Sequence, residues 1–173
     1  MNESNYNMKP QDVVILFKIL SWQGDDWKQT VLSSQLGISQ SEISESIRRL
    51  KYSGLISALD MSVNRIALIE FVIYGLRYVF PQKPGPIVRG VPTAHSASFI
   101  QDQFFSDVNF VWPSASGTSQ GQAIIPLYKT VPKAVETDAN LYQYLAIADV
   151  FRVGKVREKE IAIKLLKQKI QHA

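Results

Sequence analysis

Between residues 27 and 56, signals that stop and start helices follow one another at spacings that few folds can accommodate. Gly37 supplies a residue that tolerates the left-handed conformation, which ends a short helix running to Leu36. Beyond it, Ser39 and Glu42 have the Ser-x-x-Glu spacing of a capping box, which marks the start of a second helix. The sequence therefore predicts two helices joined by a tight turn at the glycine.

The second predicted helix, residues 40–53, has one apolar face. Ile43, Ile47 and Leu50 lie four and three residues apart, so their side chains share one side of the helix. Gly54 follows the last turn and closes the helix. Apolar residues from the preceding segment complete a small core, namely Leu32, Leu36 and Ile38.

The motif Leu-Gly-Ile-Ser-Gln-Ser-Glu-Ile-Ser at residues 36–44, with Arg49-Leu50 and Gly54-Leu55-Ile56 behind it, resembles the helix-turn-helix of bacterial transcriptional regulators of the winged-helix and MarR-like kind. The resemblance covers residues 10–56. It implies a sequence-specific DNA-binding regulator that reads the major groove of double-stranded DNA with helix 40–53. It also implies a homodimer whose interface is formed by terminal helices. Because helix–turn–helix units without a DNA function exist, the alternative is a protein-interaction module, such as an adaptor or an antitoxin-like partner.

With the apolar face of helix 40–53 inside, its outward side chains are the candidates for base contacts. Gln can pair with adenine, Arg with guanine and Glu with cytosine. Thr30 is the expected cap of the preceding helix, whose first turn can hold a phosphate through side chains and backbone amides. Arg49 and Lys51 are candidates for phosphate contacts or for plain surface residues. The predicted DNA-binding residues are Gln29, Thr30, Ser39, Gln40, Ser41, Ser44, Glu45, Arg48, Arg49 and Lys51.

A first helix precedes this unit. It is expected to begin at Pro10, because proline suits the first helical position, where its missing N–H would be unpaired anyway. Gly24 is expected to end the helix, with a turn at Asp25-Asp26. One face of the helix is marked by apolar residues at helical spacing, namely Val13, Val14, Leu16, Phe17 and Leu20.

The segment after helix 40–53 departs from the winged-helix pattern. A winged helix continues with two strands and a loop, the wing, but Leu55–Asp60 is short, so the wing is expected to be absent or displaced. Ser62 has instead the position of a cap for a helix over Val63–Val79. This helix is apolar nearly all round, which predicts that it is central and buried.

Residues 81–130 hold most of the prolines and many of the glycines, so long regular structure is not expected there. Val108–Trp112 and Gln122–Ile125 have the composition of strands. They predict a β-hairpin around a loop at residues 113–121, which could serve as a displaced wing.

Residues 131–173 return to helix. Thr137 or Asp138 can cap the first of two helices, and Gly154 breaks it before a last helix at residues 155–171. The expected buried residues of this pair are Leu141, Leu145 and Ala148, followed by Ile163, Leu166 and Ile170. We expect the pair to form the dimer interface that the resemblance implies.

These segments predict a mainly α fold with a minor β part. The helix-turn-helix domain with its following helix takes residues 1–80, an irregular segment takes 81–130, and the C-terminal helices take 131–173. The net charge of +4 is concentrated in residues 152–173, where seven basic and two acidic residues make +5, against −1 for the rest. A basic run of this kind can contact phosphates, but it is more often a solvated helix face.

We expect no enzyme, because the sequence has no G-x-S-x-G elbow, P-loop or dinucleotide fingerprint. The chain has no cysteine and only two histidines, so disulfides, thiolate metal sites and multi-histidine metal centres are not expected, nor is a cofactor. His95 and Ser96 could suggest a hydrolase, but neighbours on an extended chain point to opposite faces, so His95 is expected to be structural. The N-terminus lacks the pattern of a signal peptide, and the apolar run at residues 66–80 is interrupted by charges. We therefore expect a soluble cytoplasmic protein without membrane contact.

Overall fold

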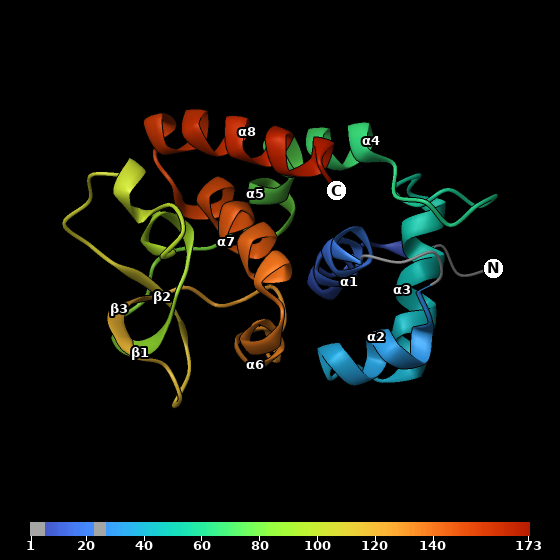
Figure 1. Ribbon diagram of the computed structural model, residues 1–173, viewed down its shortest axis with the longest axis horizontal. Helices are drawn as coiled ribbons and strands as arrows, with labels where there is room; N and C mark the ends of the chain where they lie inside the picture. The colour runs from blue at the N-terminus through green and yellow to red at the C-terminus, as the bar shows by residue number, and fades with distance from the viewer. Residues whose placement is uncertain (1–5, 23–26) are drawn as a thin grey trace.

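The computed structural model describes residues 6–22 and 27–173 and is mainly α with a small β part, as predicted (Figure 1). Its helices are α1 (Pro10–Ser21), α2 (Gln29–Leu36), α3 (Gln40–Tyr52), α4 (Arg65–Glu70), α5 (Leu76–Val79), α6 (Val131–Ala134), α7 (Ala139–Val153) and α8 (Val156–Gln171). A π-helical turn, Phe71–Gly75, joins α4 to α5, and 3₁₀ turns lie at Ala94–Ser96, Gln101–Gln103 and Val135–Thr137. The strands are β1 (Ile87–Pro92), β2 (Phe110–Pro113) and β3 (Ser119–Ala123).

Helices α1 and α7 form the centre of the molecule. They pack against each other, with α2 and α3 on one side, the strands on the other and α8 above them (Figure 1). Helix α1 begins at Pro10 as predicted, and its residues 12–20 are buried on every side. Helix α7 begins at the predicted cap Asp138, whose carboxylate accepts the Leu141 N–H at 2.9 Å. The expected end of α1 at Gly24 and the turn at Asp25-Asp26 lie outside the described residues.

The prediction of a central, buried helix over residues 63–79 is wrong. Asn64, not Ser62, caps the helix, because its Oδ1 accepts the Ala67 N–H at 3.2 Å. Only one side, carrying Leu68, Val72 and Leu76, is fully buried. The physical reason is that α1 already occupies the centre, so the segment covers α7 from outside. Some of its other apolar side chains are partly buried against the core, and four are exposed: Ile66, Tyr74, Tyr78 and Val79.

The predicted hairpin is also wrong. Strand β1 pairs antiparallel with both β2 and β3, and β2 and β3 pair with each other in parallel. The expected loop at residues 113–121 therefore contains the start of β3 and does not reverse the chain into an antiparallel neighbour. Gly90 permits the tight pairing, because a Cβ there would lie 2.0 Å from the carbonyl oxygen of Trp112.

The two C-terminal helices pack against each other as a pair. Gly154 separates α7 from α8 as predicted, and the predicted core residues Leu141, Leu145 and Ala148 of α7 are buried. The buried residues of α8 are Ala162, Leu166 and Ile170, whereas Ile163 is only partly buried. The apolar face that was expected to form a dimer interface is therefore largely covered within the chain.

A buried carboxylate connects α7 to the strands. Asp149 accepts hydrogen bonds from the Thr93 hydroxyl at 2.8 Å and from the Trp112 indole N–H at 2.6 Å. Its second oxygen accepts a hydrogen bond from Arg152 at 2.8 Å. The guanidinium also donates to the backbone carbonyls of Phe80 and Ile125, at 3.0 and 3.1 Å. Because buried charges need partners of this kind, the cluster determines how α7, the strands and the end of α5 fit together.

None of the helices in the described part of the chain combines the length and the apolar character that crossing a bilayer requires.

Candidate nucleic-acid interface

The helix-turn-helix predicted from the sequence is present in α2 and α3. Gly37 has a φ of 63° and ends α2, so the left-handed residue lies where it was predicted. Gly54 has a φ of 75°, and the Leu55 N–H returns to the Leu50 carbonyl at 3.0 Å beyond it, which closes α3. The six predicted core residues are all buried: Leu32, Leu36, Ile38, Ile43, Ile47 and Leu50.

The predicted capping box at the start of α3 is only half formed. Ser39 caps the helix, since its hydroxyl accepts the Glu42 N–H at 3.3 Å. The Glu42 carboxylate accepts hydrogen bonds from Arg49 at 2.6 Å and from Gln11 at 3.1 Å. A guanidinium is a stronger partner for a carboxylate than a backbone amide is, because the hydrogen bond joins two opposite charges. Glu42 thus serves to hold α3 on α1.

The prediction of Arg49 as a phosphate contact is wrong. Its side chain is 3% exposed and forms two hydrogen bonds with Asp12 of α1, at 2.8 and 2.7 Å. The side-chain hydrogen bonds to Asp12 raise the pKa of Arg49, although burial acts in the opposite direction. Partial burial acts to raise the pKa of Glu42, but its hydrogen bonds to Arg49 and Gln11 prevail and lower it. Arg49 is therefore a structural residue that orients α3 on α1.

The other predicted residues of α3 lie on its outward side. Gln40, Ser41, Ser44 and Arg48 are exposed, and Glu45 and Lys51 are partly exposed. Within residues 6–22 and 27–173, the side chains of Gln40 and Ser44 form no hydrogen bond with the rest of the protein. Their polar groups are therefore available to a ligand. The exposed residues lie on the side of α3 that the spacing of the buried Ile43, Ile47 and Leu50 predicted.

The start of α2 differs from the prediction by two residues. Lys28 precedes the first helical residue, Gln29, and Thr30 lies inside the first turn, so Thr30 is not the cap. Lys28, Gln29 and Thr30 are all exposed. Lys28 at the cap position makes no side-chain hydrogen bond to the helix, and no side chain among residues 6–22 and 27–173 accepts one from the first-turn amides.

Two aromatic side chains that the sequence pattern did not point to, Tyr6 and Tyr52, lie near Arg48. Arg48 forms an exposed ion pair with Glu45, and its guanidinium lies 5.3 Å from the ring centroid of Tyr6. Tyr6 in turn stacks on Tyr52, with 4.2 Å between the ring centroids. Tyr52 lies four residues after Arg48, so helical spacing could have revealed it, whereas Tyr6 comes from a distant segment and no local signal identifies it.

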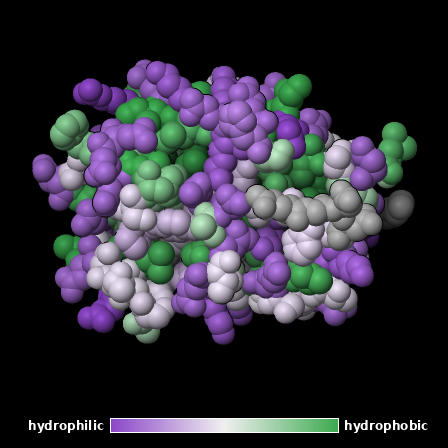
Figure 2. All heavy atoms as spheres, in the orientation of Figure 1, coloured by the Kyte–Doolittle hydropathy of each residue, from purple (hydrophilic) through white to green (hydrophobic). Residues whose placement is uncertain are grey.

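A short antiparallel bridge follows α3 directly. Ile56 pairs with Val63, and the loop between them is turned by Asp60, whose carboxylate accepts the Ser62 hydroxyl at 2.7 Å. Hydrogen bonds from the Ser62 hydroxyl and the Ser62 backbone N–H lower the pKa of Asp60 to about 2. Leu59 at the tip is 98% exposed, and Figure 2 shows hydrophobic atoms at this end of the molecule. The displaced-wing prediction is not supported, because the strands lie on the far side of α1 and α7 from α3 (Figure 1).

The core beneath this surface supplies a test of the helix phase. Ile47→Ala should lower the free energy of unfolding by about 2–5 kcal/mol, because it removes a packed side chain shared by α2 and α3. Urea denaturation followed by circular dichroism measures the change. Ser44→Ala, on the exposed side of the same helix, is the matched control and should stay within about 0.5 kcal/mol of wild type. An unchanged midpoint for Ile47→Ala would contradict the packing.

In comparisons with known proteins, no family model, no curated protein and no solved structure matches the chain. The function of the surface therefore has to be inferred from its own geometry and charge. Residues 27–64 contain four basic residues, Lys28, Arg48, Arg49 and Lys51, and three acidic ones, Glu42, Glu45 and Asp60, for a net charge of +1. With Arg49 buried in its ion pairs, the accessible surface is polar and nearly neutral.

Proposed function

We propose that this chain is a sequence-specific DNA-binding regulator of transcription that inserts α3 into the major groove of duplex DNA. The observation that carries the proposal is the outward face of α3. Its N-terminal half presents Gln40, Ser41 and Ser44, exposed hydrogen-bonding side chains that contribute little to the fold. Recognition helices contact base edges with their N-terminal residues, and glutamine and serine are suited to that task.

The start of α2 supplies the complementary contact to the DNA backbone. Gln29 and Thr30 lie in the first turn of α2, whose N-terminal amides are not capped by any side chain of residues 6–22 and 27–173. Such amides, together with the positive end of the helix dipole, bind phosphate groups well. Phosphate contacts from α2 would place α3 in register, and the side chains of α3 would read the sequence.

The small net charge of this surface has a consequence for affinity. Non-specific binding to DNA depends on the number of phosphates that basic residues neutralise, and few such residues are exposed on α2 and α3. We therefore expect weak non-specific binding with a shallow salt dependence. Hydrogen bonds to bases would then supply a larger share of the free energy of specific binding than they do in a strongly basic domain.

Arg48 is the residue whose replacement tests this mode of binding. It is the long, exposed cation on the outward face of α3, and its pair with Glu45 is a surface ion pair that costs little to break. If Arg48 contacts guanine with two hydrogen bonds, Arg48→Ala should weaken specific binding by about 1–3 kcal/mol and relax the preference at one base pair. Binding to a duplex obtained by selection from random sequence measures both effects.

Lys51→Ala is the matched comparison. Lys51 lies one turn nearer the C-terminal end of α3 and is partly exposed, so we expect it to contact a phosphate. Its replacement should weaken binding to the selected and the scrambled duplex equally. It should also lower the slope of the logarithm of the binding constant against the logarithm of the salt concentration by about one. If wild type binds neither duplex even at low salt, the DNA-binding proposal is overturned.

The second candidate function is protein interaction, with the helix-turn-helix serving only as structure. It is favoured by exposed apolar side chains at the C-terminal end of α3 and in the loop that follows it, where Tyr52 is 71% and Leu59 98% exposed. Exposed aromatic and aliphatic groups near a polar rim are typical of protein-binding surfaces. Leu59→Ser separates the two functions. If the chain binds DNA through α3, the change should leave DNA binding intact; if it binds a protein through this apolar surface, the change should abolish that binding.

A further inference from the structure

Three side chains form a stack on the outward side of α3. The guanidinium of Arg48 lies over the ring of Tyr6, 5.3 Å from its centroid. The same ring stacks on Tyr52, with 4.2 Å between the ring centroids and 20° between the ring planes. Arg48 and Tyr52 are four residues apart, so they are neighbours on one face of the helix. Tyr6 comes from the segment before α1, and it is the member of the stack that contacts both of the others.

The segment that carries Tyr6 is anchored to the fold by the residues that follow it. Met8 packs against the hydrophobic core. The backbone N–H of Lys9 donates a hydrogen bond to the buried carboxylate of Asp12 at 2.9 Å. The ammonium group of Lys9 lies 3.4 Å from the carboxylate of Glu42 on α3. Because these contacts lie within three residues of Tyr6, they restrict the chain that carries its ring.

The stack restrains Arg48 and still leaves it able to bind a base. Glu45 forms an ion pair with the guanidinium, and Tyr6 lies against it. An aromatic ring attracts a guanidinium through its quadrupole. The N–H groups of a guanidinium point outward in its own plane, so a guanidinium that rests on a ring can still donate hydrogen bonds from its edge. Arg48 can therefore remain on the ring while its edge contacts guanine.

We infer that Tyr6 is a positioning residue for DNA recognition, which holds Arg48 in the orientation in which it pairs with guanine. The inference rests on the DNA-binding function proposed above. A long side chain loses rotamer freedom when it binds, and one that is already held in its bound orientation loses less. Tyr6 thereby raises the affinity for guanine at the base pair that Arg48 reads, and it leaves the preference at other base pairs unchanged.

Replacement of the ring tests this role on two duplexes. One is the selected duplex, and in the other the base pair at which Arg48→Ala relaxes the preference is replaced. Tyr6→Leu keeps apolar bulk but removes the aromatic face. It should weaken binding to the selected duplex about three- to tenfold and should leave binding to the altered duplex nearly unchanged. Tyr6→Phe keeps the ring and should bind as the wild type does.

A double variant separates positioning of Arg48 from a general effect on the fold. When Arg48→Ala is already present, Tyr6→Leu should cause no further loss of affinity, because the side chain that the ring positions is gone. If Tyr6→Leu alters the circular dichroism spectrum, Tyr6→Met takes its place and must show the same loss.

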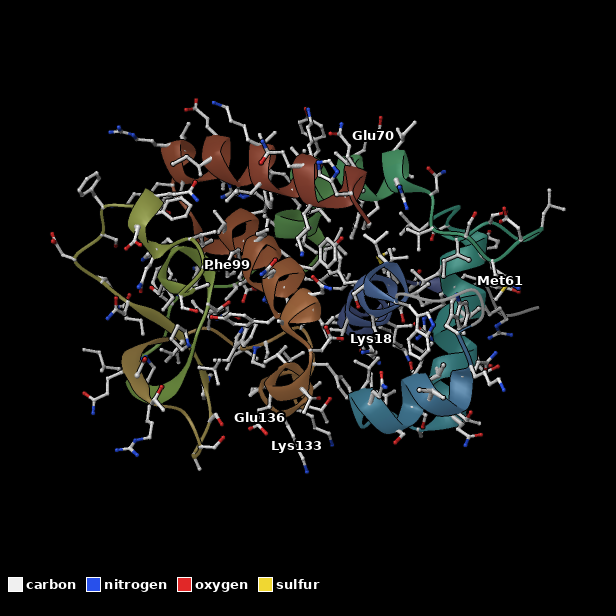
Figure 3. All side chains as sticks on the ribbon, in the orientation of Figure 1. Lys18, Met61, Glu70, Phe99, Lys133 and Glu136 are labelled. Atoms are coloured by element: carbon white, nitrogen blue, oxygen red, sulfur yellow. The ribbon has the colours of Figure 1, made fainter. Side chains whose placement is uncertain are left out.

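Tyr78→Leu provides the matched control. Arg77 lies over the ring of Tyr78 at 5.4 Å, so this change removes the same kind of contact from another surface. Tyr78 belongs to α5, and α1 lies between α5 and α3 in Figure 1. In Figure 3, Glu70 at the end of α4 lies at the upper edge of the molecule, whereas Met61 in the loop after α3 lies at the right. Tyr78→Leu should leave binding to both duplexes unchanged.

The possible results distinguish this inference from the proposed function. Equal losses of Tyr6→Leu on both duplexes, or a further loss in the Arg48→Ala background, would overturn the positioning role. If Arg48→Ala binds weakly but Tyr6→Leu binds as the wild type does, the inference is overturned and the DNA-binding proposal stands. If Arg48→Ala itself binds as the wild type does, Arg48 reads no base and the inference is overturned as well. A wild type that binds neither duplex overturns both.

Discussion

Arg49→Ala should lower the free energy of unfolding by about 3–5 kcal/mol, the largest effect that we expect from a change within α3. The replacement removes the cationic partner of Asp12, a carboxylate whose side chain is fully buried, and leaves that charge without compensation. It also removes a partner of Glu42, so that two elements of the α1–α3 contact weaken together. Urea denaturation followed by circular dichroism measures the loss.

The neighbouring arginine supplies the control for that experiment. Arg48→Ala breaks an ion pair too, but both side chains of that pair are 43% exposed, so the loss should stay below about 1 kcal/mol. The stability that the Glu42–Arg49 ion pair contributes depends on pH. Because the pKa of Glu42 is lowered in the fold, its contribution is complete above the ordinary pKa of glutamate and is lost as the pH falls through the lowered value. Equal losses for Arg48→Ala and Arg49→Ala would contradict the buried network.

Asp149→Ala should destabilise the protein by a similar amount, about 3–5 kcal/mol, for a related reason. It leaves the Arg152 guanidinium buried without its anion and removes the acceptor of the Trp112 indole N–H. The two backbone carbonyls that also bind Arg152 retain it in place but do not neutralise its charge. Chemical denaturation monitored by tryptophan fluorescence measures the change.

Thr93→Val separates the charge from a single hydrogen bond in the same cluster. Valine has nearly the same shape as threonine but cannot donate to Asp149, so this change removes one neutral donor and leaves the Asp149–Arg152 pair in place. The expected loss is about 1 kcal/mol, well below that of Asp149→Ala. If Asp149→Ala is no more harmful than Thr93→Val, the buried pair does not stabilise the junction of α7 with the strands.

Several helix starts and stops were predictable from a few adjacent residues, although the caps predicted at Thr30 and Ser62 were wrong. The conformation of Gly37, the cap at Ser39, the closing role of Gly54 and the cap at Asp138 are all found where they were predicted. Each of these signals acts through a local φ angle or through a hydrogen bond within about five residues, so no knowledge of the tertiary structure is needed. The apolar spacing of α3 likewise predicted which side is buried, and hence the outward residues of the candidate site.

The sequence alone thus determined the helix-turn-helix and the mainly α character of the protein. Only the tertiary structure decided which segment is central and what each charged side chain does. Arg48 and Arg49 are adjacent and chemically identical, but they point about 100° apart around α3, so one faces solvent and the other faces Asp12. In the same way, the apolar composition of residues 63–79 did not reveal that α1 occupies the centre instead. Burial depends on which elements compete for the same core, and that competition is settled by contacts between segments far apart in the chain.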